Sequence, residues 1–229
     1  MNGLTSGEQR AESGEQTFGR HDERASAFLL STLRPLLSAL LPSAYFFQIR
    51  ACFNMPRFLA RLIFLPTLCW NMLLARLSPR RRWWDRIDEH VILGAMPFAW
   101  HVPKLHAEGV RAVINMCDEY GGPIAEYERL GITQLRIPTV DFNPPELSKV
   151  RDGVEFIRQQ AAAGNDVYVH CKAGRARSAA VVVCWLMAEK GLTPRQALES
   201  VQKKRPHVKR GLDRQAVVKE FAAQLPVAS

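Results

Sequence analysis

The chain has 229 residues, of which 47% are hydrophobic and 23% charged, and its formal net charge is +9. A single domain typically takes about 100 to 200 residues, so this length indicates one domain with an extension, and the composition excludes global disorder. The positive charge favours an anionic partner: nucleic acid, an anionic membrane or a phosphorylated substrate. No nucleic-acid-binding motif accompanies the charge, so we expect no nucleic-acid partner.

The cysteines are odd in number, widely spaced and without a CxxC pair: Cys52, Cys69, Cys117, Cys171 and Cys184. This pattern indicates neither a disulfide framework nor a zinc site, so we expect a reducing compartment and no metal or other cofactor. Cys184 lies in the apolar run AAVVVCWLM and is predicted to be a core residue, as is Cys117.

The N-terminal third divides into two segments. Residues 1–26 carry several acidic residues and no apolar run, which predicts a disordered tail and fits neither a secretory signal nor a transit peptide. Residues 27–78 are apolar but interrupted by arginines and prolines, whereas a bilayer span needs about 20 predominantly apolar residues. We therefore favour helices at a membrane interface, supported by the basic and aromatic cluster Arg80–Trp84. A true span and helices packed against the following domain remain alternatives.

Residues 79–225 are predicted to form one catalytic domain, because from Ile87 onward short apolar runs alternate with amphipathic helical stretches. Such alternation predicts an α/β fold with a mainly parallel sheet flanked by helices on both faces. The expected strands cover residues 91–93, 112–116, 134–137 and 166–170. The expected helices cover residues 102–108, 124–130, 145–162, 177–190, 194–203 and 213–223.

The segment DVYVHCKAGRARS, Asp166–Ser178, reads as a strand, a small loop with Gly174 and a helix. Consecutive N–H groups in such a loop, with the positive end of the helix dipole, form a cradle for a tetrahedral anion. Cys171 begins this loop. A free thiol has a pKa of about 8.5 and is only about 3% ionised at pH 7. A pKa lowered by about three units would ionise it almost fully. An inert core cysteine would not be followed by Lys172, Arg175 and Arg177, because burial would leave their charges without water or partners.

Arg177 has five residues between it and Cys171, so a curled loop returns its guanidinium to two phosphate oxygens in a bidentate contact. Ser178 is placed to donate a hydrogen bond to the departing sulfur. The leaving alkoxide needs a general acid, and Asp141 in IPTVDFNPPEL is the candidate because two prolines stiffen the loop that follows it. Asp118 and Glu119 are the alternative acids.

The nonapeptide HCKAGRARS, His170–Ser178, resembles the HCxxGxxR[ST] active-site loop of the protein-tyrosine-phosphatase superfamily, in its dual-specificity branch. WWDRID, VILGAMPF and the CKAGRAR form of the loop are similar to the mitochondrial-type phosphatidylglycerophosphate phosphatases, over roughly Phe64–Phe221. The resemblance implies the compact dual-specificity phosphatase fold without a metal, Cys171 as nucleophile, Arg177 as phosphate clamp and Asp141 as general acid. It also implies a supporting role for His170 and a phosphate-binding loop of Lys172, Ala173, Gly174, Arg175, Ala176 and Arg177.

DFNPPEL also resembles the acid loop of 3-phosphoinositide phosphatases, so Lys172 and Arg175 are expected to favour a doubly anionic lipid headgroup. We therefore expect a monomeric lipid phosphatase that acts on phosphatidylglycerophosphate at a membrane surface. The acidic N-terminus does not look like a mitochondrial presequence, so the organelle does not follow from the resemblance; we expect the mitochondrial inner membrane in a eukaryote and the cytoplasmic face of the membrane in a bacterium. A dual-specificity or tyrosine protein phosphatase is the alternative, and a catalytically inactive module that binds phosphorylated ligands is a third possibility.

Overall fold

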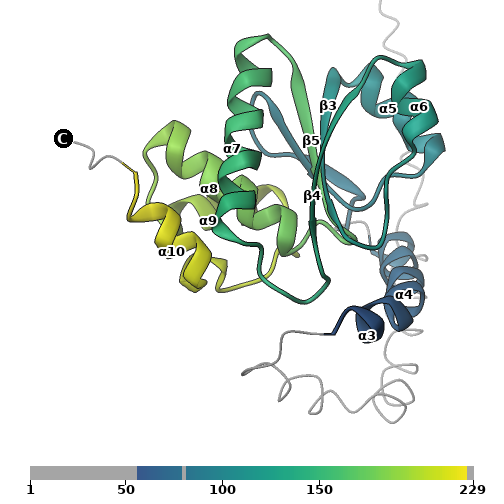
Figure 1. Cartoon of the computed structure of the whole chain (residues 1–229), viewed down its shortest axis with the longest axis horizontal. Coiled ribbons are helices and arrows are strands. Elements are labelled where there is room, and N and C mark those ends of the chain that lie inside the picture. Colours follow the sequence, from purple (N-terminus) through teal and green to yellow (C-terminus); the bar gives the residue numbers. More distant parts are fainter. Residues whose placement is uncertain (1–55, 79–80, 226–229) are drawn as a thin grey trace, which may run out of the picture. The chain divides into compact units, whose positions relative to one another are not determined.

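The computed structural model describes residues 56–78 and 81–225, all within one compact unit of the chain (Figure 1). The predicted tail and the part of the apolar segment before residue 56 lie outside the described residues. The strands are β1 (Trp84–Arg86), β2 (Val91–Gly94), β3 (Val110–Cys117), β4 (Thr133–Thr139) and β5 (Asp166–His170). The α-helices are α3 (Arg57–Leu62), α4 (Phe64–Leu77), α5 (Val102–Ala107), α6 (Ile124–Arg129), α7 (Leu147–Ala162), α8 (Arg177–Lys190), α9 (Pro194–Lys204) and α10 (Ala216–Ala222). Two short 3-10 helices are η1 (Ala99–His101) and η2 (Leu212–Arg214).

The five strands form one sheet in the order β1-β2-β5-β3-β4, in which only the β1–β2 pair is antiparallel. The predicted mainly parallel sheet is therefore confirmed. β5 lies at its centre, and His170 at the end of β5 pairs with Gly94 of β2 and Asn115 of β3. Parallel strands leave their carboxyl ends at one edge, so the chain after His170 emerges in the middle of that edge, where open α/β sheets commonly bind ligands.

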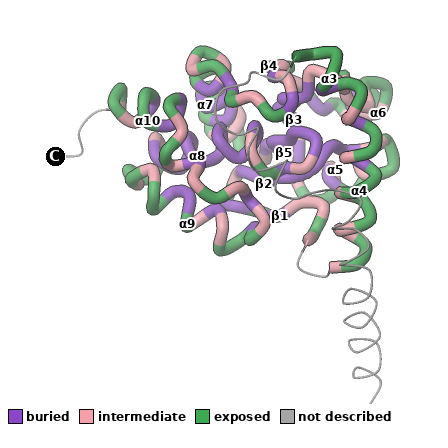
Figure 2. Tube along the Cα trace, turned by 90° about the horizontal axis from the view of Figure 1, so that it is seen from below, coloured by how far each residue is buried: buried purple, intermediate pink, exposed green. Residues whose placement is uncertain are grey.

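Helices cover both faces of the sheet: α5 and α6 lie on one side, and α7 to α10 on the other (Figure 1). The strand side chains alternate between these layers, as the pleat requires. Val91 and Leu93 join the larger cluster beneath α7 and α8, whereas Ile92 joins the smaller cluster beneath α5. Helix α8 is buried at every position from Arg177 to Met187, which explains why its sequence is apolar on all sides (Figure 2).

Helix α4 packs one face against the domain, through Phe64 and Leu68, which contact Met96 after β2. Its other face and α3 carry most of the exposed large hydrophobic side chains of the described residues: Phe58, Leu59, Leu62, Leu65, Trp70, Met72, Leu73 and Leu77. Neither helix, nor any other in the described part of the chain, has the length and hydropathy needed to cross a bilayer. Packing against the following domain is therefore observed for one face of α4, and the membrane interface stays a prediction.

Strand β1 is absent from the sequence predictions, because three residues reading Trp-Asp-Arg show neither an apolar run nor a recognisable alternation. The predicted helix over residues 213–223 is also different in the structure. It begins as the 3-10 turn η2, and Gln215 is extended with φ −66° and ψ 141°, so α10 starts only at Ala216. The remaining predicted strands and helices agree with the structure to within about two residues, a usual margin for element ends.

Candidate active site

The loop between β5 and α8, residues 171–176, forms the cradle at the centre of the sheet edge. Gly174 has φ +62°, and a Cβ atom there would lie 2.3 Å from the carbonyl oxygen of Gly94. Only glycine adopts this conformation and this close approach without strain. The Lys172 carbonyl also accepts a hydrogen bond from the Met96 N–H at 3.2 Å, so the segment after β2 holds the loop.

Arg205, which the sequence analysis missed, supports the outer side of this loop. It is 1% exposed, donates from Nε to the Gly174 carbonyl at 2.9 Å and from Nη2 to the Ala173 carbonyl at 3.2 Å. Its Nη1 forms a buried ion pair with Asp85 Oδ2 at 2.7 Å. Because these carbonyls point outward to Arg205, the N–H groups of the same peptide units point the other way, into the cradle, as an anion site requires.

Cys171 is buried at the start of the loop, and its sulfur accepts a hydrogen bond from the Ser178 hydroxyl, with 3.2 Å between Sγ and Oγ. Burial acts to raise the pKa of this thiol. The positive charge of Arg177 and hydrogen bonds from Ser178 and the Arg175 backbone outweigh burial and lower the pKa to about 7. A pKa below the ordinary value of a thiol makes thiolate available at neutral pH, in the direction that the sequence predicts.

The Arg177 guanidinium is 2% exposed and lies between two carboxylates. Its Nη1 donates to the Thr139 carbonyl at 2.6 Å and contacts Glu119 Oε2 at 3.2 Å, while Nη2 lies 2.9 Å from Asp141 Oδ1. Burial opposes the charge, but Cys171 and the two carboxylates raise the Arg177 pKa further above its ordinary value. The guanidinium therefore stays charged beside the sulfur.

Of the three candidate acids, the structure brings Asp141 and Glu119 to the cradle. Glu119 is buried behind the site, where its Oε1 accepts the Asp141 N–H at 3.0 Å, so it lies in a position to orient Arg177 and the Asp141 loop. Asp118 instead faces α3 and lies 3.8 and 3.9 Å from Arg57 and Arg61. Asp141 is 9% exposed, and its loop turns sharply at the next residue, which has φ 68°.

His170 is fully buried behind Cys171 and stacks on Tyr168 with 5.7 Å between ring centroids. Burial lowers the His170 pKa to about 3, against a hydrogen bond with the Cys171 backbone, and the Arg177 charge lowers it further. The imidazole is therefore neutral at physiological pH. The supporting role that the sequence resemblance implies for His170 stays a prediction.

The two cationic side chains of the loop point in different directions. The Lys172 ammonium is buried against Asp141 and Thr67 of α4. Arg175 turns to the other end of the loop, where its Nε donates to the His207 carbonyl at 2.9 Å.

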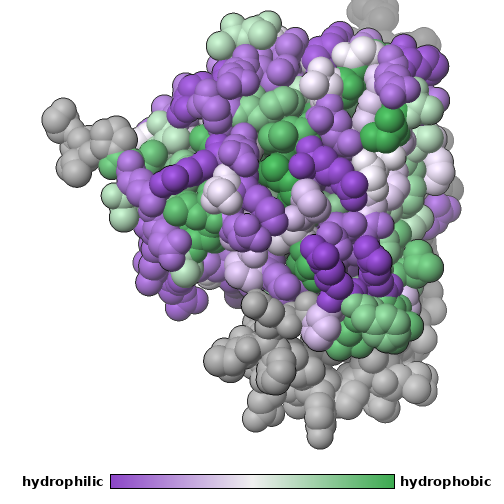
Figure 3. All heavy atoms as spheres, viewed as in Figure 1, coloured by the Kyte–Doolittle hydropathy of each residue, from purple (hydrophilic) through white to green (hydrophobic). Residues whose placement is uncertain are grey.

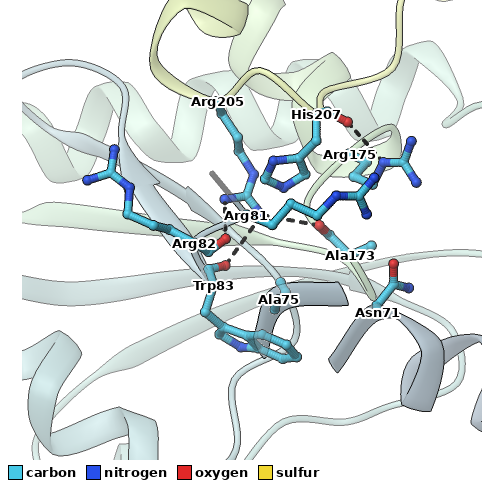
Figure 4. A pocket seen from close by; sticks show the side chains of 10 residues that line it. Asn71, Ala75, Arg81, Arg82, Trp83, Ala173, Arg175, Arg205 and His207 are labelled. Atoms are coloured by element: carbon cyan, nitrogen blue, oxygen red, sulfur yellow. Dashed lines mark hydrogen bonds between the residues drawn. The ribbon is translucent and has the colours of Figure 1, made fainter. Parts of the chain in front are cut away.

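A small pocket lies on this Arg175 side of the loop (Figure 4). Figure 4 shows Arg81, Arg175, Arg205 and His207 converging on it from separate segments. Burial and the charges of these three arginines lower the His207 pKa to about 3, so the imidazole is neutral. Asp85, which pairs with Arg205 and Arg82, offsets only part of the positive charge. Sequence reasoning missed this cluster because its members are separated by up to 126 positions.

Comparison with known proteins identifies the family. Residues 91–224 match the family model described as dual specificity phosphatase, catalytic domain. The phosphatidylglycerophosphate phosphatase PTPMT2 of Arabidopsis thaliana is 39% identical over 165 residues, which are 71% of this chain and 72% of that protein. The phosphatidylglycerophosphatase and protein-tyrosine phosphatase 1 of Mus musculus is 38% identical over 176 residues, 73% of this chain and 91% of that protein.

Solved structures agree with these matches. The crystal structure of PTPMT1 in complex with PI(5)P is 38% identical, covers 62% of this chain and 96% of its own, and has a TM-score of 0.58. The region that matches the family model contains strands β2 to β5 and the whole cysteine loop. The chain therefore belongs to the dual specificity phosphatase family.

Proposed function

We propose that this chain hydrolyses phosphate monoesters through a phosphocysteine intermediate and that its substrate is phosphatidylglycerophosphate. In the first step the Cys171 thiolate forms a bond to phosphorus while the bond from phosphorus to the substrate oxygen breaks. Asp141 acts as the general acid and gives a proton to that oxygen. In the second step a water attacks the phosphocysteine and passes a proton to Asp141, and the sulfur leaves with a hydrogen bond from Ser178.

The arrangement around Cys171 carries this proposal. Its sulfur lies 3.2 Å from the Ser178 hydroxyl, and its pKa of about 7 makes a nucleophile available at neutral pH. Thr139 and Glu119 hold Nη1 of Arg177, so the Nε and Nη2 edge is the one that serves a phosphate. A phosphate that binds there displaces Asp141 from Nη2 and frees its carboxyl group for proton transfer.

Two observations favour a lipid substrate over a phosphoprotein. Arg81 and Arg175, which line the pocket beside the loop, add positive charge next to the cradle, which suits a headgroup with a second phosphate. The relatives from Arabidopsis and mouse are named for phosphatidylglycerophosphate. The mouse name also includes protein-tyrosine phosphatase, so phosphotyrosine remains the second candidate substrate.

Membrane association is part of the proposal. The exposed apolar side chains of α3 and α4 stand beside Arg57, Arg61 and Arg76, a combination typical of helices that lie in the headgroup region. Figure 3 shows hydrophobic side chains gathered next to strongly hydrophilic ones on one face of the molecule. We propose a membrane surface as the site of action, on the mitochondrial inner membrane in a eukaryote or the cytoplasmic face in a bacterium.

A substrate comparison tests the proposal. The full chain is assayed for phosphate release from phosphatidylglycerophosphate, phosphoinositides and phosphotyrosine peptides, with Cys171→Ser as the blank. We expect kcat/KM to be highest for phosphatidylglycerophosphate and activity to be absent in the blank. A preference for peptides over every lipid would overturn the lipid assignment. Binding of phosphate esters without turnover of any would indicate a binding module instead.

A further inference from the structure

The Lys172 side chain is almost completely enclosed, with 4% of the residue exposed. Its Nζ atom donates to Thr67 Oγ1 at 2.7 Å and forms an ion pair with Asp141 Oδ2. Two aromatic rings flank the ammonium, Phe64 at 5.2 Å and Phe142 at 5.1 Å from Nζ to the ring centroid. A cation held by an anion, a hydroxyl and two ring faces has little freedom to follow a substrate.

Thr67 and Phe64 belong to α4, upstream of residue 91, where the match to the family model begins. The Thr67 hydroxyl also lies 2.6 Å from the Ile63 carbonyl and 3.0 Å from the Phe64 carbonyl. A carbonyl can only accept and an ammonium can only donate. The hydroxyl therefore donates into the helix backbone and accepts from Lys172, which fixes the direction of both bonds.

Asp141 consequently has two cationic anchors that differ in one respect. Arg177 Nη2 contacts Oδ1 at 2.9 Å, but Arg177 must turn its fork to an incoming phosphate. Lys172 contacts Oδ2, and the hydroxyl to which it donates, that of Thr67, lies on α4 rather than in the cradle. When substrate takes Arg177, Lys172 still ties the Asp141 carboxyl group to α4, while Oδ1 keeps the hydrogen bond that it accepts from the neighbouring Phe142 N–H at 3.1 Å.

We propose that Lys172 is a positioning residue that holds Asp141 for proton transfer by tying it to Thr67, so that α4 is a working part of the catalytic apparatus. This inference rests on the proposed function, because it assigns Asp141 as the general acid. It differs from the sequence expectation that the Lys172 side chain recognises the headgroup. It also places a helix with an exposed apolar face one side chain away from the proton donor.

The test compares substrates that do and do not need a proton donor. Full-length Lys172→Met and Thr67→Val are measured with phosphatidylglycerophosphate, an alkyl ester, and with fluorinated umbelliferyl phosphate, whose leaving group departs without a proton. A misplaced catalytic group loses on the order of 10- to 100-fold. For the alkyl ester we expect that loss in kcat/KM, which reports the steps up to departure of the leaving group, with Lys172→Met, and a loss of about 3- to 10-fold with Thr67→Val. For the aryl ester we expect a loss in kcat/KM of less than about 3-fold with either variant.

Two matched variants control for the helix itself. Thr67→Ser keeps the hydroxyl, and Cys69→Ser alters an exposed position of α4 that is not among its large apolar side chains. Both are expected to retain wild-type ratios of alkyl to aryl turnover. In an Asp141→Asn background, Lys172→Met should cause no further loss, because the group that it positions is already gone.

Equal losses on the alkyl and aryl esters would overturn the inference and return Lys172 to phosphate binding. A loss that persists in the Asp141→Asn background would overturn it in favour of a structural role. In both cases the wild type still turns over the lipid and forms the phosphocysteine. Failure of the proposed function is different, since the wild type itself would then release no phosphate from either ester.

Discussion

Arg205 has two roles that substitutions can test separately: it stabilises the fold through Asp85, and it holds the shape of the cradle through the loop carbonyls. In Arg205→Met, Asp85 stays buried and loses the partner that lies 2.7 Å away, although Arg82 Nε still contacts its other oxygen. Breaking a buried ion pair typically costs about 3 to 5 kcal/mol. Since Arg82 remains, we expect a loss of about 2 to 4 kcal/mol in the free energy of unfolding.

The double variant Asp85→Leu with Arg205→Met removes both charges. Replacing a buried pair by apolar residues of similar volume is often neutral for stability, so most of the lost free energy should return. Activity should not return, because the carbonyls of Ala173 and Gly174 have lost their donors. Two lost hydrogen bonds at about 1 kcal/mol each predict about a 30-fold weaker binding of an oxyanion such as vanadate.

The assays are urea denaturation for stability, and kcat/KM with vanadate inhibition for the cradle. Wild-type vanadate affinity in the stable double variant would refute the reasoning, because the loop would then hold its shape without Arg205. Recovery of activity in step with stability would do the same, since Arg205 would then serve the fold alone.

Three further predictions concern the site itself. Glu119→Gln removes the negative charge that contacts Arg177 Nη1. A charge-assisted hydrogen bond contributes about 1.5 to 3 kcal/mol, so kcat/KM should fall about 10- to 100-fold while circular dichroism shows the fold retained. Unchanged turnover would contradict this. The rate at which iodoacetamide alkylates Cys171 should rise with pH through a midpoint near 7, because only the thiolate reacts. Ser178→Ala should move this midpoint upward, because it removes a hydrogen bond to the sulfur. A wild-type midpoint above about 8 would exclude a lowered pKa for Cys171. Gly174→Ala places a Cβ atom 2.3 Å from the Gly94 carbonyl oxygen, at a residue with φ +62°. The strain should distort the cysteine loop and lower its affinity for vanadate at least about tenfold. Wild-type affinity would show that the loop tolerates the methyl group.

Sequence reasoning succeeded where chemistry is encoded locally. An apolar strand, a loop with one glycine and an apolar helix placed Cys171, Arg177 and Ser178 together, and the Ser178 hydroxyl does reach the sulfur. The alternation of strands and helices predicted the parallel sheet correctly, because each element is long enough to show the hydrophobic periodicity of its own secondary structure. Asp141 lies beside Arg177 as expected, since the chain after β4 ends at the same sheet edge as the cysteine loop.

What the sequence could not predict depends on contacts between distant segments. Arg205 and Asp85 are 120 positions apart, and Lys172 and Thr67 are 105 apart. Local patterns assign charged residues to the surface by default, because most of them are exposed. Only the folded chain reveals that the Lys172 side chain contacts Thr67 of α4, or that Glu119 accepts the Asp141 N–H and contacts Arg177.

Covalent trapping at Cys171 tests the central claim most directly. The full chain is mixed with phosphatidylglycerophosphate, quenched with acid during turnover and analysed by mass spectrometry. The proposed chemistry predicts one added phosphoryl group on Cys171, present during turnover, gone once substrate is exhausted and absent from Cys171→Ser. Steady turnover with no phosphorus on this sulfur, or turnover that survives in Cys171→Ser, would contradict it.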